Sequence, residues 1–308
     1  MGQNSCQGRG WLPDLPDVRD FGYDHPSILP MLRRLSREPE RGNCDEVDLR
    51  ADEEGEYFPA VADQGPRNSS TAFAVLALTE YFQRRVFGST YNGSPRFLYR
   101  VTRYGFESQT TVAGQCLCEE NDAGASIRNT FKALKRFGTP PEKRFSYQGA
   151  NLNEEPSSFL YQLSSQPFSL NYFRLDEANC SGKLTWERIL SFVSAGFPIV
   201  FGFSVPESIT QSGEIPYRGS FENFHSGQAA LVVGFRKNHF GAGEDALRVR
   251  NSWGTEWGAN GYGWLPKSFV EKQLARDFWT CVSESWFGAE DELHPLSGDL
   301  ACPSIVPE

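Results

Sequence analysis

Residues 64–88 read QGPRNSSTAFAVLALTEYFQRRVFG, and this stretch decides the fold. Polar residues that can cap a helix stand near its start, residues 72–87 contain no glycine or proline, and two arginines and a glycine stand near its end. These features together are typical of a single α-helix. Because apolar residues occur on nearly all sides of this helix, we expect it to be central and buried.

The rest of the chain changes from helical to extended patterns. Residues 123–137 and 185–195 predict two further helices, each followed by glycine and proline. Beyond them, short runs rich in valine, isoleucine and aromatic residues predict strands. These runs are residues 199–205, 229–235, 246–251 and 262–265. Helices in the first half and strands in the second predict an α+β fold with two lobes.

The same patterns predict how the chain is divided. Residues 1–60, rich in proline, arginine and acidic residues, are expected to form an irregular N-terminal arm lying on the body. The body is expected at residues 61–287. Its helical lobe takes about residues 61–170 and its β-rich lobe about residues 171–287. Residues 288–308 form a predicted C-terminal tail.

Charge and composition exclude several classes of function. The chain has 30 basic and 39 acidic residues and a net charge of −9, so no long-range field draws it to nucleic acid or to an anionic membrane. The longest apolar runs are about seven residues, against about 20 in a membrane-spanning helix, so no membrane insertion is expected. The N-terminus lacks the basic start and apolar run of a secretory signal, which predicts a cytoplasmic location.

The seven cysteines predict neither a disulfide scaffold nor a metal site. They are odd in number and scattered along a long chain, which favours reduced thiols. Cys116 and Cys118 are separated by one residue, closer than the usual zinc-ligand spacing, and no Cys-x-x-Cys pair exists elsewhere. We therefore expect no metal and no cofactor.

Three sequence blocks occur in a characteristic order. Residues 61–65 read VADQG and lead through a short loop to STAFA at the helix start, residues 227–235 read GQAALVVGF, and residues 251–258 read NSWGTEWG. Together they resemble the papain-like cysteine peptidase superfamily. Shorter matches resemble its bacterial members: residues 11–17, 124–128 and 277–279. The resemblance covers about residues 10–287 and implies a helical lobe and a β-rich lobe separated by a cleft.

The resemblance also assigns roles to four positions. In the superfamily, a thiolate at the helix start is the nucleophile and a histidine from the other lobe is the general base and acid. An asparagine orients the histidine, and a glutamine amide helps to form the oxyanion hole. The glutamine position is Gln64 and the asparagine position is Asn251. The nucleophile position holds Ser70 and the histidine position holds Gln228.

Two of the four positions therefore hold a residue of a different chemical type from the one that the superfamily has there. The Gln228 amide neither accepts a proton near neutral pH nor becomes cationic, so it cannot activate Ser70. Arg67 and Asn68 stand where the superfamily commonly has small residues, and we expect them to crowd the approach of a substrate. With Trp253 they are the further expected cleft residues. These changes predict a degenerate active site.

The predicted function is that of a catalytically inactive papain-like pseudopeptidase, which binds or regulates a protein or peptide partner through the inter-lobe cleft. One alternative is an active hydrolase in which Ser70 uses a non-standard base such as His225. A second alternative is a structural subunit whose cleft is filled by its own N-terminal arm or C-terminal tail.

Overall fold

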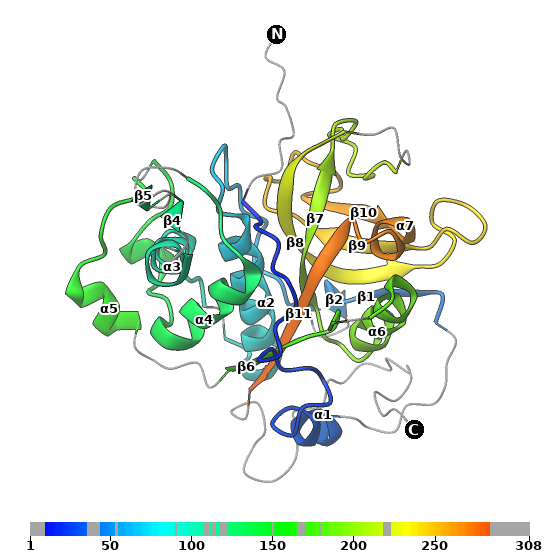
Figure 1. Ribbon diagram of the computed structural model, residues 1–308, viewed down its shortest axis with the longest axis horizontal. Helices are drawn as coiled ribbons and strands as arrows, with labels where there is room; N and C mark the ends of the chain where they lie inside the picture. Colours follow the sequence, from blue (N-terminus) through cyan, green and yellow to red (C-terminus); the bar gives the residue numbers. More distant parts are fainter. Residues whose placement is uncertain are drawn as a thin grey trace.

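The computed structural model describes residues 10–35, 44–52, 55–89, 91–107, 111–112, 115–116, 122–149, 151–164, 170–178, 180–217 and 223–283. Helices α2 to α5 lie on one side of the molecule, and a large sheet with helices α6 and α7 lies on the other (Figure 1). Helix α1 lies beneath the two halves. The α+β fold with two lobes that the sequence predicts is confirmed.

One antiparallel sheet of seven described strands forms the β-rich lobe. Six strands follow the order β10-β9-β8-β7-β11-β6, and β1 pairs with the far end of β8. The strands are β1 (Glu46–Asp48), β6 (Leu170–Arg174), β7 (Ile199–Pro206), β8 (Phe224–Arg236), β9 (Ala246–Arg250), β10 (Tyr262–Pro266) and β11 (Ala275–Ser283). Strands β7 and β8 are mostly buried because the helices α2 and α6 pack against both.

Helix α2 (Ser70–Phe87) is the centre of the helical lobe and contacts β8 of the other lobe. Gly88 ends it in the left-handed region, at a φ of 59°, and its N–H bonds to the Arg84 carbonyl. The side-chain cap expected at its start is not formed. Ser69 holds the N-cap position, but its hydroxyl lies 2.6 Å from the Tyr147 hydroxyl.

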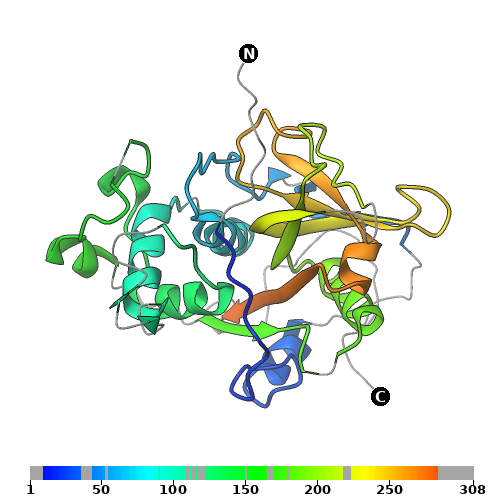
Figure 2. The same ribbon diagram turned by 45° about the horizontal axis from the view of Figure 1, so that its top comes forward.

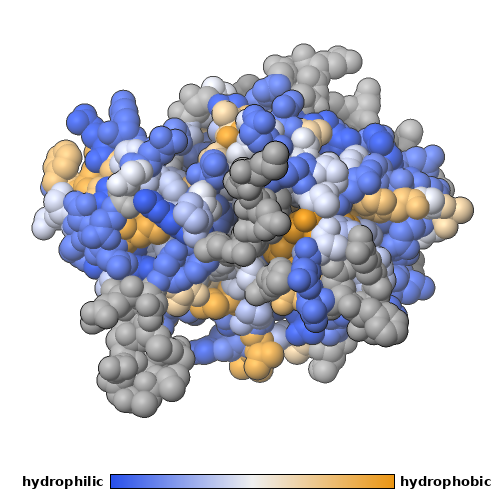
Figure 3. All heavy atoms as spheres, turned by 90° about the horizontal axis from the view of Figure 1, so that it is seen from above, coloured by the Kyte–Doolittle hydropathy of each residue, from blue (hydrophilic) through white to orange (hydrophobic). Residues whose placement is uncertain are grey.

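The remaining helices lie around this central one. The predicted helices at residues 123–137 and 185–195 are present as α4 and α6. The full set is α1 (Leu29–Leu35), α3 (Pro95–Thr102), α4 (Ile127–Phe137), α5 (Ser158–Ser164), α6 (Gly182–Ser194) and α7 (Lys267–Glu271), with a π-helical turn at Arg103–Glu107 and a 3-10 turn at Glu142–Arg144. No described helix has the length and apolar character required to cross a membrane. Seen from above, most of the described surface is hydrophilic, with hydrophobic groups visible near the middle (Figure 3).

Residues 1–60 contain regular elements in their described part. Helix α1 and strand β1 belong to this segment, and β1 joins the main sheet through Val47 opposite Phe235. Two short hairpins complete the described elements: β2 (Ala51–Asp52) with β3 (Gly55–Glu56), and β4 (Thr111–Val112) with β5 (Gln115–Cys116). The predicted tail at residues 288–308 lies outside the described residues.

The start of the described chain runs between the two lobes (Figures 1 and 2). Trp11 fixes it there: its indole Nε1 donates to Asp277 Oδ2 at 2.9 Å, and the Asp14 N–H donates to the same oxygen at 2.9 Å. Asp277 also forms an ion pair with Arg174. Burial raises the pKa of Asp277, and the Arg174 guanidinium opposes this shift. The arm is thus hydrogen-bonded to Asp277 of β11, whose carboxylate is paired with Arg174 of β6.

This anchor generates a stability prediction. Asp277 has a φ of 58°, which asparagine tolerates better than most residues, so Asp277→Asn removes the charge without much backbone strain. Because a buried guanidinium loses one of its partners, we expect the free energy of unfolding in urea to fall by about 3 kcal/mol. The control is Asp17→Asn, which breaks the exposed pair with Arg19 and should change stability little. Equal stability of the two variants would contradict the stabilising role of the buried Asp277–Arg174 pair.

Candidate functional site at the lobe junction

The first turn of α2 touches β8 where the two lobes meet. Ser70, the first residue of the helix, is fully buried, and its Oγ accepts a hydrogen bond of 3.1 Å from the Ala229 N–H. Ala229 directly follows Gln228, which lies opposite Phe203 in the sheet. The side chain at the predicted nucleophile position therefore holds the two lobes together.

Gln228 is the centre of a buried polar network. Its Nε2 donates to Gln64 Oε1 at 2.9 Å and to Asn251 Oδ1 at 2.8 Å, and it lies 3.3 Å from Ser252 Oγ. Ser252 Oγ donates to Gln64 Oε1 at 2.6 Å. All four side chains are at most 6% exposed. Since an amide nitrogen carries two hydrogens, both Gln228 donor positions point at acceptors within this network.

Gln64 directs its own amide donor away from the junction. Gln64 Nε2 donates to the Arg67 carbonyl at 2.7 Å, within the same loop. The Gln64 carbonyl accepts from the Tyr147 hydroxyl at 2.8 Å. Burial raises the pKa of Tyr147 to about 12, so this hydroxyl stays protonated and remains a donor. The Gln64 end of this loop is therefore held by neutral hydrogen bonds.

The three other predicted cleft residues lie around this loop. Arg67 stacks on the Tyr147 ring at 5.1 Å, and its Nη1 donates to the Tyr147 carbonyl at 3.1 Å. The Asn68 N–H donates to Asp122 Oδ2 at 2.7 Å, and its side-chain amide bonds to the Asp122 carbonyl. Trp253 is half-buried and packs edge-on against Trp257 at 5.2 Å. The Arg67 side chain thus packs against Tyr147 of the helical lobe.

Residues 10–12 of the chain bridge the two lobes beside this network. The Trp11 N–H donates to the Gly227 carbonyl at 3.2 Å, the Leu12 N–H to the Ala125 carbonyl at 3.0 Å, and the Ala125 N–H to the Gly10 carbonyl at 2.8 Å. A Cβ on Gly227 would lie 2.6 Å from the Trp11 carbonyl oxygen. An extended segment of the chain itself therefore uses backbone groups of both lobes.

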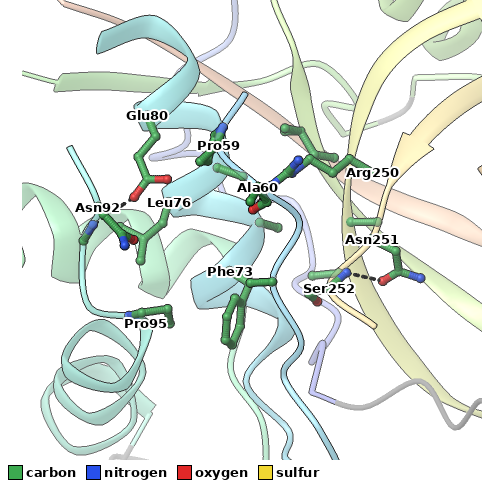
Figure 4. Close-up of a pocket in the computed structure, with 17 residues that line it drawn as sticks. Pro59, Ala60, Phe73, Leu76, Glu80, Asn92, Pro95, Arg250, Asn251 and Ser252 are labelled. Atoms are coloured by element: carbon green, nitrogen blue, oxygen red, sulfur yellow. Dashed lines mark hydrogen bonds between the residues drawn. The ribbon is translucent and has the colours of Figure 1, made fainter. Parts of the chain in front are cut away.

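A cavity of about 80 Å³ lies behind the junction, between α2 and the sheet (Figure 4). Small side chains line much of it, and Glu80 and Arg250 approach it from α2 and β9. Glu80 Oε1 accepts from the Gly93 N–H at 2.9 Å. Burial raises the pKa of Glu80 to about 7, although this hydrogen bond and Arg250 oppose the shift.

The structure brings together the residues that the sequence singled out. Gln64, Gln228 and Asn251 share hydrogen bonds, and Ser70 joins them through the residue next to Gln228. Sequence reasoning missed Ser252, which bridges two members of the network, although it stands in the quoted NSWG block. The side chains of His225, Cys116 and Cys118 lie outside the described part of the chain.

The two lobes, the central helix and the polar network at their junction define a papain-like fold. A family model described as papain family cysteine protease matches residues 44–275, and the chain belongs to this family. It is 30% identical over 285 residues to the "Uncharacterized peptidase C1-like protein L477" of Acanthamoeba polyphaga mimivirus, a match covering 88% of this chain and 85% of that one.

Solved structures agree with this assignment. Xylellain, a cysteine protease from Xylella fastidiosa, is 26% identical with a TM-score of 0.68, over 92% of this chain and 98% of that one. The digestive procathepsin L2 proteinase from Tenebrio molitor larval midgut is 17% identical with a TM-score of 0.61, over 90% and 78% of the two chains. The second likeness shows the fold alone.

The buried Glu80 generates a prediction on pH. Its carboxyl binds a proton more tightly in the folded protein than when unfolded, because its pKa rises from 4.5 to about 7. Between these values the native state holds more protons, so this group lowers the free energy of unfolding as pH increases, by about 3 kcal/mol in total. We expect Glu80→Gln to gain stability relative to the wild type between pH 5 and pH 8. Urea unfolding at both pH values, with Glu80→Asp as the ionisable control, measures this. A constant difference between Glu80→Gln and wild type would refute it.

Proposed function

We propose that this chain is a non-catalytic member of the papain family that binds a protein or peptide partner. The observation that carries the proposal is the set of hydrogen bonds that the Gln228 amide donates inside the lobe junction. The side chain opposite the start of α2 is a buried amide whose donors are engaged by Gln64 and Asn251. Such a group cannot take the Ser70 proton or return it to a leaving group.

Two further contacts support the absence of catalysis. Ser70 Oγ accepts a hydrogen bond from a backbone N–H across the junction, so at least one lone pair of the would-be nucleophile is engaged. The Gln64 amide, which the family resemblance places at the oxyanion hole, donates to the Arg67 carbonyl. One of the two hydrogens of this amide is therefore engaged within the loop and is not available to a transition-state oxyanion.

The contacts of residues 10–12 support a role in binding peptides. The junction holds an extended segment by backbone hydrogen bonds from both lobes, at Ala125 and Gly227. Backbone pairing of this kind is how many domains bind extended chains. In this protein the segment belongs to the same chain, so an external peptide that uses the same groups must compete with it.

The first test concerns catalysis. We expect the wild type to hydrolyse a mixed peptide library no faster than Ser70→Ala, since the general base is absent. We also expect no labelling of Ser70 by serine-directed or thiol-directed active-site probes, as judged by mass spectrometry of its peptides. Hydrolysis that Ser70→Ala abolishes, or an adduct on Ser70, would instead establish the hydrolase alternative.

The second test concerns binding in the cleft. Trp11→Ala removes the indole that packs on Gly202 and bonds to Asp277, so it weakens the hold of residues 10–12. Because the internal competitor is then weaker, we expect a partner that copurifies with the wild type to be retained several-fold more strongly. Trp11→Phe keeps a ring on Gly202 and is the matched control. Quantitative mass spectrometry of the copurified material measures retention, and unchanged retention would exclude the cleft as the binding site.

A further inference from the structure

The cavity between α2 and the sheet has two buried side chains of opposite charge in its wall. Figure 4 shows Glu80 of α2 on one side of it and Arg250 of β9 on the other. Glu80 is 5% and Arg250 is 6% exposed. Within the described part of the chain, Arg250 acts on the Glu80 carboxyl through its charge alone, and no hydrogen bond joins the two. Two opposite charges therefore face one space without touching.

Glu80 leaves one carboxyl oxygen for a ligand. Its Oε1 accepts from the Gly93 N–H at 2.9 Å, whereas its Oε2 has no hydrogen-bond partner among the residues that the structure describes. In Figure 4 this second oxygen points away from Gly93, toward the side of the cavity where Arg250 lies. A buried oxygen without a donor costs free energy, so a donor placed in the cavity would stabilise it.

Arg250 has donors that remain for an anionic acceptor. Its Nη1 donates to the Tyr262 hydroxyl at 2.8 Å, and its Nη2 donates to the Ala60 carbonyl at 2.9 Å. Both acceptors are neutral, and no carboxylate of the described residues forms an ion pair with Arg250. A guanidinium group carries five N–H bonds, so these two hydrogen bonds leave others and the positive charge itself without a matching anion.

The space between the two charges is small and mostly apolar. Its volume of about 80 Å³ holds roughly five to eight groups of the size of a water molecule. Each water needs two to four polar partners. The polar lining residues Asn251 and Ser252 already bond within the junction network. Alanine and leucine side chains of α2 and β8 make up much of the rest: Ala74, Leu76, Ala77, Ala229, Ala230 and Leu231. A short aliphatic chain with charged ends therefore matches this lining better than a cluster of waters does.

The cavity has an entrance for a small molecule. Three residues of its lining, Ala60, Ala62 and Asn92, are exposed to solvent. The opening therefore lies between residues 60–62 and Asn92, and a ligand can enter without separation of the two lobes.

We propose that this cavity binds a small zwitterion, in which an ammonium group and a carboxylate are joined by a short aliphatic chain. The ammonium group donates to Glu80 Oε2, and the carboxylate accepts from the N–H groups of Arg250. The methylene groups lie against the alanine and leucine side chains. Charge-assisted hydrogen bonds of this kind are stronger than neutral ones. The site is separate from the hydroxyl of Ser70, so the inference does not depend on the loss of peptidase activity.

The Glu80 carboxyl gives this site a dependence on pH. Burial raises its pKa to about 7, and Glu142 adds to the increase. The Gly93 N–H, Arg250 and Arg84 oppose it. An ammonium group binds the ionised carboxylate in preference to the protonated acid, so affinity increases as pH rises through the pKa. Between pH 6 and pH 8 the ionised fraction grows about tenfold, and we expect the affinity to rise by about the same factor.

The test uses the full chain and 4-aminobutanoate as the probe, a zwitterion whose size lies in the range that the cavity holds. Isothermal titration calorimetry at pH 8 should show saturable binding. Butanoate lacks the ammonium group and butylamine lacks the carboxylate. Each should bind about tenfold more weakly, because one buried charge is then left without its partner.

Two variants locate the site. Glu80→Gln keeps the shape of the side chain and removes its charge, so binding at pH 8 should weaken about tenfold and no longer change between pH 6 and pH 8. Ala77→Leu adds bulk to the lining and should also weaken binding in a protein that circular dichroism shows to be folded. The matched control is Glu187→Gln, an exposed position on α6, which should bind like the wild type and keep its pH dependence.

Three outcomes would overturn the proposal. One is the absence of saturable binding of 4-aminobutanoate by the wild type, which would mean that the cavity holds water only. Another is equal binding of butanoate and 4-aminobutanoate, which would make the cavity a site for simple anions. The third is binding by Glu80→Gln and Ala77→Leu that equals the wild type, which would place the bound probe elsewhere.

Discussion

The burial of helix α2 between the two lobes is the constraint on which the rest of the structure depends. Residues Ser70 to Phe82 are all buried, so the helix has no solvent-facing side over most of its length. Polar groups in this buried stretch are therefore stabilised by partners inside the protein. Ser70 bonds to the Ala229 N–H and Glu80 to the Gly93 N–H, and these contacts fix the sheet and the following loop against the helix.

Local patterns in the sequence were sufficient to predict the elements around this helix. Helices α2, α4 and α6 and strands β7 to β10 each combine a clear apolar pattern with glycine, proline or asparagine at their ends. The convergence of Gln64, Gln228 and Asn251 could be predicted only from the motif resemblance, because no local pattern relates positions so far apart. The predicted loss of activity still depends on the roles that the resemblance assigns.

The path of residues 10–25 could not be predicted from the sequence. Trp11 and Asp277 are 266 positions apart, and their hydrogen bond follows from tertiary packing. The need for glycine at positions 202 and 227 can be understood only once the position of Trp11 is known, because a Cβ on either glycine would clash with Trp11. Ser69 shows a different limit of sequence-based prediction. Serine is a common helix cap, but the hydroxyl of Ser69 bonds to the buried Tyr147 hydroxyl and does not cap the helix.

The neutral network at the lobe junction also bears on which side chains of the protein can be oxidised. A peptidase of this family depends on a reactive thiolate, which oxidants convert stepwise to sulfenic and sulfinic acids. The position that the resemblance assigns to this thiolate holds Ser70 in this chain, and neither its hydroxyl nor the amides of Gln64 and Gln228 enter that chemistry. Cys281 lies in β11, and burial raises the pKa of its thiol, which keeps it in the unreactive form. The side chains that join the lobes at this junction are therefore not targets of thiol oxidation.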